Sequence, residues 1–201
     1  MATVLEIEYS YDDLDGCLGE ALGTEFPDFT GAYYDGDFTL PLEEAQRRKR
    51  EFVLDSIGCR RGSRILDIGC GWGNLLNAAR ARGAGGLGLT LSPAQGKRCR
   101  TNGLDVRLQD WKDLDAAEAG RFDGVVSLGA FEHFCSMEEF VAGRQEEIYS
   151  RFFGLFSEVL PRKGRLFLQT MTWGKNLPWG RQFPRTLEGY RQFLDPKAPL
   201  R

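Results

Sequence analysis

The feature that most constrains the fold of this chain is a glycine-rich turn at residues 67–73, which reads Asp-Ile-Gly-Cys-Gly-Trp-Gly. A short apolar run, Ile65–Leu66, precedes the turn, and a helical pattern follows it from Asn74. In an α/β domain, a strand that enters a helix through closely spaced glycines leaves room for a nucleotide-like ligand. Glycine lets the backbone approach such a ligand, and the first N–H groups of the helix point toward it. The sequence therefore predicts an α/β domain with a ligand site at this turn.

The spacing of the glycines narrows the class of ligand. Gly69, Gly71 and Gly73 form a G-x-G-x-G pattern, and the acidic Asp67 stands two residues before it. A dinucleotide-binding fingerprint reads G-x-G-x-x-G and is followed by an acidic residue after the second strand. The pattern found here resembles the first motif of class I methyltransferases, which use S-adenosylmethionine. The alternative interpretation is a tight strand-to-helix turn that binds no ligand.

Composition excludes several other classes of protein. The chain has 201 residues and a formal net charge of -3, so no overall basic field favours nucleic acid as a partner. No apolar run approaches the length of a membrane-spanning helix, and the N-terminus lacks the pattern of a secretory signal. The five cysteines show no C-x-x-C spacing, which argues against a disulfide framework and against a zinc site. We expect a reduced, cytoplasmic protein without a metal ion, in which Cys70 is a packing residue.

The apolar pattern predicts strands that alternate with helices, as in a doubly wound, mostly parallel sheet of the Rossmann-like type. The expected strands span residues 64–68, 86–90, 105–109, 122–128 and 165–170. The expected helices span residues 41–57, 74–82, 93–102 and 140–160. We interpret the chain as three regions: an N-terminal cap at 1–40 with a short helix near 12–22, a ligand-binding domain at 41–175, and an incomplete or irregular segment at 176–201.

Polar side chains follow the predicted strands at the edge of the sheet where ligands bind in such folds. Thr90 and Gln95 follow the second strand and offer neutral hydrogen bonds to a sugar. Asp110 and Trp111 follow the third strand and place a carboxylate beside a flat ring suited to an adenine. We therefore expect these four residues to contact the ligand, with a plain core position as the alternative for Trp111.

An acid and the single histidine of the chain, Glu132 and His133, follow the fourth strand. Both are candidate catalytic residues, because a carboxylate or an imidazole can accept a proton or stabilise a cation. The alternatives are that Glu132 caps the next helix or pairs with an arginine, and that His133 is a buried structural histidine. The basic run at residues 47–50 is interpreted as a solvated helix face, with contact to anionic lipid headgroups as the minor alternative.

Taken together, these motifs resemble the cyclopropane fatty acid synthases and mycolic acid cyclopropane synthases, with their fatty acid methyltransferase relatives. The resemblance covers roughly residues 26–174 and rests on the stretches at 67–73, 88–95 and 126–134 and on Leu168-Gln169-Thr170. It implies S-adenosylmethionine as the cofactor and an unsaturated fatty acyl chain of a lipid as the substrate. It also implies a cofactor pocket made of Phe29, Thr30, Gly69, Gly71, Thr90, Gln95, Trp111, Leu128 and Gly129.

Two side chains and the length of the chain depart from the family pattern. Where the cap motif of the family reads Y-S-C-A-Y, residues 29–33 read Phe-Thr-Gly-Ala-Tyr, so Gly31 replaces a cysteine that helps to hold a bicarbonate ion. Gln169 replaces a family histidine at the end of the fifth strand. The chain stops at Arg201, before the last strands of the family, and we expect a C-terminally truncated member.

Three functions remain open on this basis. The favoured one is methyl transfer to an unsaturated acyl chain with inefficient ring closure, because Gly31 and Gln169 do not supply the bicarbonate cage. The second is a small-amine N-methyltransferase of the same fold, and the third is a non-catalytic protein that binds the cofactor. A lipid substrate is compatible with peripheral contact with a membrane, and the sequence leaves the oligomeric state open.

Overall fold

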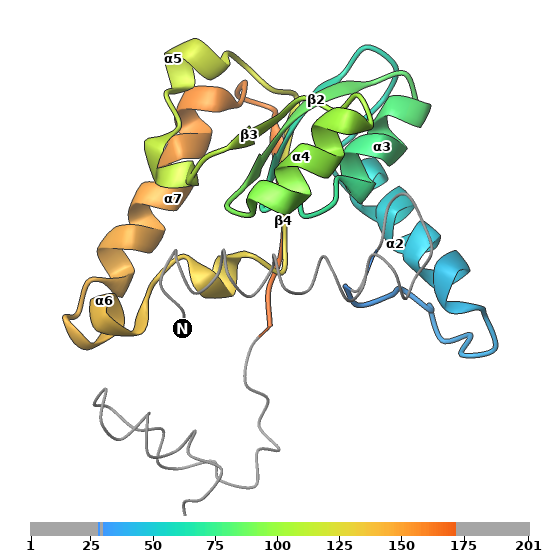
Figure 1. Ribbon diagram of the computed structural model, residues 1–201, viewed down its shortest axis with the longest axis horizontal. Helices are drawn as coiled ribbons and strands as arrows, with labels where there is room; N and C mark the ends of the chain where they lie inside the picture. Colours follow the sequence, from blue (N-terminus) through green and yellow to red (C-terminus); the bar gives the residue numbers. More distant parts are fainter. Residues whose placement is uncertain (1–27, 29, 172–201) are drawn as a thin grey trace, which may run out of the picture.

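The computed structural model describes Asp28 and residues 30–171, and its architecture is a sheet with helices on both faces (Figure 1). Five strands pair in the order β3-β2-β1-β4-β5, and every pairing is parallel. Their bounds are β1 Arg64–Ile68, β2 Gly85–Thr90, β3 Val106–Leu108, β4 Gly124–Leu128 and β5 Arg165–Gln169. The strand order reverses between β1 and β4, and ligands bind at the carboxyl ends of the strands beside such a switch point.

The helices form two layers. Helices α2 Leu42–Ser56, α3 Asn74–Ala81 and α4 Pro93–Thr101 pack on one face, and α5 Ala116–Ala119 and α7 Gln145–Val159 on the other (Figure 1). The connections after β3 and β4 also contain two 3₁₀ turns and a short helix, namely η1 Trp111–Asp113, η2 Phe131–His133 and α6 Met137–Val141. None of the described helices is long and apolar enough to cross a membrane.

Strand β1 is buried on both faces. Ile65 packs among the side chains of α2, α3 and α4, whereas Leu66 and Ile68 pack in the layer of α7. Each of the three is at most 2% exposed. Successive residues of a strand point to opposite faces, so a strand covered on both faces needs apolar side chains at successive positions. The central strand is therefore a rigid support for the glycine turn that follows it.

The five strands and the helices α2, α3 and α4 expected from the sequence are confirmed in their order, whereas α5 was not expected and the single helix expected over 140–160 is wrong. Helices α6 and α7 are separate, because Gly143 turns the chain with a φ of +73°. Ser136 and Glu139 form a capping box at the start of α6, in which each side chain accepts from the backbone N–H of the other. The short helix expected near 12–22 and the segment 176–201 lie outside the described residues.

Candidate active site

The glycine turn after β1 folds back against β2. Gly69 and Cys70 both donate their backbone N–H groups to the Leu89 carbonyl, at 2.9 Å each. Gly69, Gly71 and Gly73 adopt φ values of +79°, +54° and +78°, a region that favours glycine. A Cβ at Gly69 would lie 2.4 Å from the Ala130 Cβ, whereas a Cβ at Gly71 would meet nothing within 4 Å. The turn therefore packs tightly at its first glycine and leaves open space at its second.

A cavity of about 640 Å³ lies in front of this turn. Nearly all site residues expected from the sequence line it: Thr30, Asp67, Gly69, Gly71, Thr90, Gln95, Asp110, Trp111, Leu128, Gly129, Glu132 and His133. The remaining one, Phe29, lies outside the described residues. Within 28 and 30–171, no three histidine, cysteine or acidic side chains gather closely enough to hold a metal ion. The carboxyl ends of β1, β2 and β4 thus converge on one cavity of a size suited to a small molecule.

A neutral polar network follows β2. The Thr90 hydroxyl donates to Gln95 Oε1 at 2.9 Å, and the Ser92 backbone N–H donates to the Thr90 hydroxyl at 3.2 Å. Ser92 caps α4, since its hydroxyl accepts from the Gln95 backbone N–H at 3.1 Å. These mutual bonds fix Thr90 and Gln95 at the cavity wall, where they present hydroxyl and amide groups.

Two carboxyl groups of the cavity wall, Asp67 and Asp110, have different surroundings. Asp67 is 3% exposed, and burial raises its pKa to about 7. Its carboxyl group therefore gains or loses a proton near neutral pH. Asp110 caps η1, because its carboxylate accepts from the Lys112 backbone N–H at 3.0 Å. This cap sets the direction in which the chain enters η1.

Trp111 belongs to both the cavity wall and an aromatic cluster. The ring is 5% exposed. Its centroid lies 5.3 Å from that of Phe134 and 5.1 Å from that of Phe152. Such packing fixes the indole ring, so any ligand that stacks on it meets a preformed surface. The stacking of an adenine on Trp111 stays a prediction.

The candidate catalytic residues lie in η2, directly after β4. Glu132 Oε2 accepts from the Thr170 hydroxyl at 2.8 Å, while Glu132 Oε1 is buried and has no hydrogen-bond partner among the described residues. Burial lowers the pKa of His133, so its imidazole is neutral at neutral pH. The alternative that Glu132 caps the next helix is wrong, because Ser136 caps α6. Oε1 of Glu132 is therefore available to interact with a group that enters the cavity.

The two positions that depart from the family pattern also line the cavity. A Cβ at Gly31 would meet no atom within 4 Å, so this position leaves open space. Gln169 ends β5, and its carbonyl accepts from the Gly129 backbone N–H at 2.9 Å. The wall around Glu132 therefore contains no side chain at position 31 and a neutral amide at position 169.

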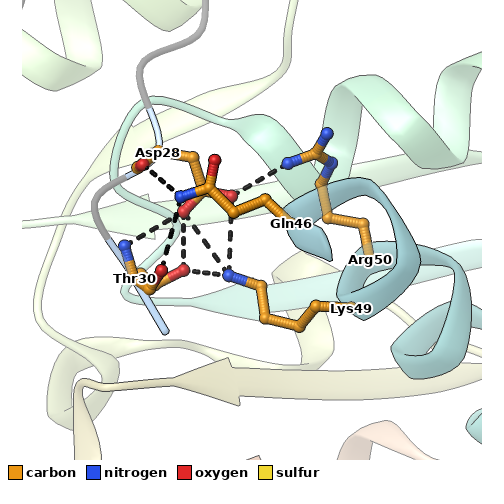
Figure 2. Close-up of polar contacts among 5 residues, drawn as sticks. All are labelled: Asp28, Thr30, Gln46, Lys49 and Arg50. Atoms are coloured by element: carbon orange, nitrogen blue, oxygen red, sulfur yellow. Dashed lines mark hydrogen bonds and ion pairs between the residues drawn. The ribbon is translucent and has the colours of Figure 1, made fainter. Parts of the chain in front are cut away.

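A polar cluster that sequence reasoning missed ties the segment before α2 to that helix (Figure 2). The Asp28 carboxylate lies 3.4 Å from Lys49 Nζ and 2.9 Å from an Arg50 guanidinium nitrogen. It also accepts from the Thr30 hydroxyl at 2.6 Å, and Gln46 Nε2 donates to the Asp28 carbonyl at 2.6 Å. We call these five residues the α2 clamp. The clamp holds Thr30 and Gly31 at the cavity wall.

The burial of Lys49 corrects the interpretation of residues 47–50 as a solvated face. The Lys49 side chain is 8% exposed, and burial lowers its pKa against the opposing effect of Asp28. Lys49 lies four residues after the buried Ala45 and four before the buried Val53, so all three share one face of α2. This spacing was the signal in the sequence that could have identified Lys49 as a buried residue.

Comparison with known proteins agrees with this geometry. Residues 3–182 match the family described as mycolic acid cyclopropane synthetase. The cyclopropane mycolic acid synthase 2 of Mycobacterium leprae is 38% identical over 155 residues, which cover 71% of this chain and 48% of that protein. The chain thus spans about half the length of the curated relatives it matches.

Solved structures give the same assignment. The cyclopropane synthase MmaA2 from Mycobacterium tuberculosis matches with a TM-score of 0.72 at 27% identity, over 96% of this chain and 65% of that chain. The mycolic acid cyclopropane synthase CmaA1, complexed with SAH and CTAB, gives a TM-score of 0.64 at 28% identity, over 83% of this chain and 56% of that chain. The chain therefore belongs to the mycolic acid cyclopropane synthetase family of S-adenosylmethionine-dependent methyltransferases.

Proposed function

We propose that this chain binds S-adenosylmethionine in the cavity after β1 and transfers its methyl group to a carbon of an unsaturated fatty acyl chain. The observation that carries the proposal is that the open glycine turn and the Glu132 carboxylate line the same cavity. The similarity to cyclopropane mycolic acid synthases supports a lipid acceptor. The acceptor is therefore a long apolar chain whose double bond reaches the cavity near Glu132.

The residues after β1, β2 and β3 fit the parts of the cofactor. The space at Gly71 admits the methionine part against the backbone, and Thr90 with Gln95 faces the ribose hydroxyls. The fixed ring of Trp111 offers a stacking surface for the adenine. When bound, the cofactor supplies a methyl group that its sulfonium already activates. The work of the protein is then to align the acceptor and to exclude water.

Glu132 supplies the negative charge that this reaction needs near the acceptor. Addition of a methyl group to one alkene carbon leaves a positive charge on the neighbouring carbon. A carboxylate fixed in a buried site stabilises that charge as it develops. The Thr170 hydroxyl orients the carboxylate through Oε2, and Oε1 remains able to accept a proton from the cation.

The site of proton loss decides the product. Loss from the added methyl group closes a cyclopropane ring, whereas loss from a chain carbon leaves a methyl-branched alkene. The resemblance to the family assigns ring closure to a bicarbonate ion held by side chains at positions 31 and 169, which here are Gly31 and Gln169. The proposed main product is therefore the methyl-branched alkene.

A second candidate acceptor is a small amine. Asp110 and Glu138 line the cavity and could face a cation, although Lys112 and Arg144, which also line it, pair with the third carboxylate, Glu139. An N-methyltransferase of this fold would bind the cofactor at the same residues and would accept the methyl group on an amine nitrogen.

The test combines binding with product analysis on the full chain. Calorimetric titration with S-adenosylhomocysteine, with NAD as the control ligand, measures the cofactor site. Isotope-labelled S-adenosylmethionine is then incubated with phospholipid vesicles of cis-monounsaturated or saturated acyl chains, or with a secondary amine. We expect label in the unsaturated chains, with branched alkene in excess over cyclopropane by mass spectrometry and NMR.

Two variants sharpen the assay. Glu132→Gln keeps the shape of the side chain and removes the charge, so methylation should fall by about a hundredfold or more while S-adenosylhomocysteine still binds. Glu158→Gln, at an exposed position of α7, is the matched control and should leave the rate unchanged. Label on the amine alone, excess cyclopropane, or no transfer by a chain that binds S-adenosylhomocysteine would each overturn the lipid methylation proposed here.

A further inference from the structure

Two cysteines from different elements meet beneath the glycine turn. Cys99 Sγ in α4 lies 3.4 Å from the Gly71 carbonyl oxygen, and Cys70 Sγ in the turn lies 3.8 Å from the same atom. Both thiols donate to this one oxygen, and each perturbs the ionisation of the other. Both are free and buried, with Cys99 at 0% exposure and Cys70 at 8%. The cofactor chemistry uses neither of them.

We propose that Cys70 and Cys99 are a modification site, at which peroxide forms a reversible disulfide that weakens binding in the cofactor cavity. The Cys70 sulfur attacks one oxygen of hydrogen peroxide, its proton passes to solvent, and the O–O bond breaks. Hydroxide leaves and takes a proton from solvent, so Cys70 becomes a sulfenic acid. The Cys99 sulfur then attacks the Cys70 sulfur, the S–O bond breaks, and a second water leaves. The two thiols are oxidised together, and one peroxide is reduced to two waters.

The surroundings of the pair favour this reaction. Cys70 lines the cavity, so peroxide that enters the cavity reaches its sulfur. The neighbouring Cys70 lowers the pKa of Cys99, and Arg100 and Arg98 on α4 add to this effect, whereas burial and Asp67 oppose it. The neighbouring Cys99, burial and the Asp67 carboxyl group raise the pKa of Cys70. Cys99 therefore ionises more readily than Cys70, which suits it to attack the oxidised Cys70 sulfur in the second step.

A disulfide at this place moves the turn. Its S–S bond is about 2 Å long, much shorter than the contact distance of two sulfur atoms that are not bonded. Cys70 stands between Gly69 and Gly71, and a Cβ at Gly73 would lie only 3.1 Å from Cys99 Sγ. The sulfurs approach each other only if the glycine turn or α4 shifts. By linkage, a ligand bound against the turn disfavours the disulfide at equilibrium by the same factor by which the disulfide weakens ligand binding.

The experiment treats the full chain with hydrogen peroxide and measures two quantities. Peptide mapping detects a Cys70–Cys99 link, and calorimetric titration gives the affinity for S-adenosylhomocysteine before oxidation, after oxidation and after reduction by dithiothreitol. We expect the link, an affinity about tenfold weaker after oxidation, and recovery after reduction. Cys99→Ser and Cys99→Ala should lose the response to peroxide. Cys59→Ser, at a buried cysteine elsewhere in the core, should keep it.

The inference rests on the proposed function only where it takes S-adenosylhomocysteine as the ligand of the cavity. If that ligand does not bind the reduced chain, the proposed function fails, while peptide mapping still tests the cysteine pair. Sulfinic acid at Cys70 without a link to Cys99 would overturn the inference. A link that leaves the affinity unchanged would do the same.

Discussion

Replacement of Asp67 by Asn removes a buried carboxyl group whose ionisation opposes folding. Burial raises the pKa of this group from 3.8 to about 7 in the folded protein. Between these two values the folded state holds a proton that the unfolded state has released, so the free energy of unfolding falls as the pH rises through this window. Each pH unit of the window is worth about 1.4 kcal/mol. From pH 5 to pH 8, the wild type should therefore lose roughly 3 kcal/mol relative to Asp67→Asn.

The assay is urea unfolding of both proteins at pH 5, 6, 7 and 8, followed by circular dichroism without ligand. Titrating groups that the two proteins share cancel in the difference between their unfolding free energies. That difference should grow in favour of Asp67→Asn up to pH 7 and then level off. Asp105→Asn, at an exposed position, is the control and should give a flat difference. If the unfolding free energies of the wild type and Asp67→Asn change with pH in parallel, the burial argument is refuted. If the wild type instead gains stability relative to Asp67→Asn as the pH rises, the pKa of Asp67 is lowered by folding and not raised.

Three further predictions concern the clamp, the turn and a helix cap. Asp28→Ala leaves the buried Lys49 without its counter-charge and should lower the free energy of unfolding by about 3 kcal/mol. Adding Lys49→Met to the same chain should recover most of this stability in thermal melts. If the two substitutions instead lower the stability additively, the clamp is contradicted. Gly71→Ala places a Cβ at a φ of +54°, so the free energy of unfolding should fall by about 1 kcal/mol in urea unfolding. The same Cβ enters the open space in front of the turn, so the affinity for S-adenosylhomocysteine should fall about tenfold by calorimetry. Ser136→Ala removes the cap of α6 and should cost about 1 kcal/mol in urea unfolding, and an unchanged midpoint would count against the capping box.

The sheet and most of the cavity could be predicted from the sequence because their signals are local. A strand buried on both faces reads as an apolar run, and glycines mark the positions where the chain turns with positive φ. The carboxyl ends of parallel strands share one edge of the sheet. Thr90, Trp111 and Glu132, each placed shortly after a strand, could therefore be assigned to one site without knowledge of the fold in detail.

The features that sequence reasoning missed depend on contacts between distant residues or on competing local signals. Lys49 is buried because Asp28, outside its helix, compensates its charge, and a run of basic residues carries no trace of such a partner. Gly143 within an apolar pattern was compatible with a continuous helix. The capping box that begins at Ser136 was the better local signal, since it starts α6 before the expected helix. The approach of the Cys99 and Cys70 sulfurs to the same Gly71 oxygen follows from the packing of α4 against the turn, which no sequence spacing reveals.

The residues that line the cavity follow two separate groups of strands. The glycine turn and Thr90 stand on β1 and β2, whereas Glu132 and Gln169 follow β4 and end β5. The hydrogen bonds that hold the turn and Thr90 involve neither the Glu132 nor the Gln169 side chain. Under the function proposed above, changes at Glu132 and Gln169 would therefore alter the acceptor and the product, while the hydrogen bonds that hold the turn and Thr90 stay the same.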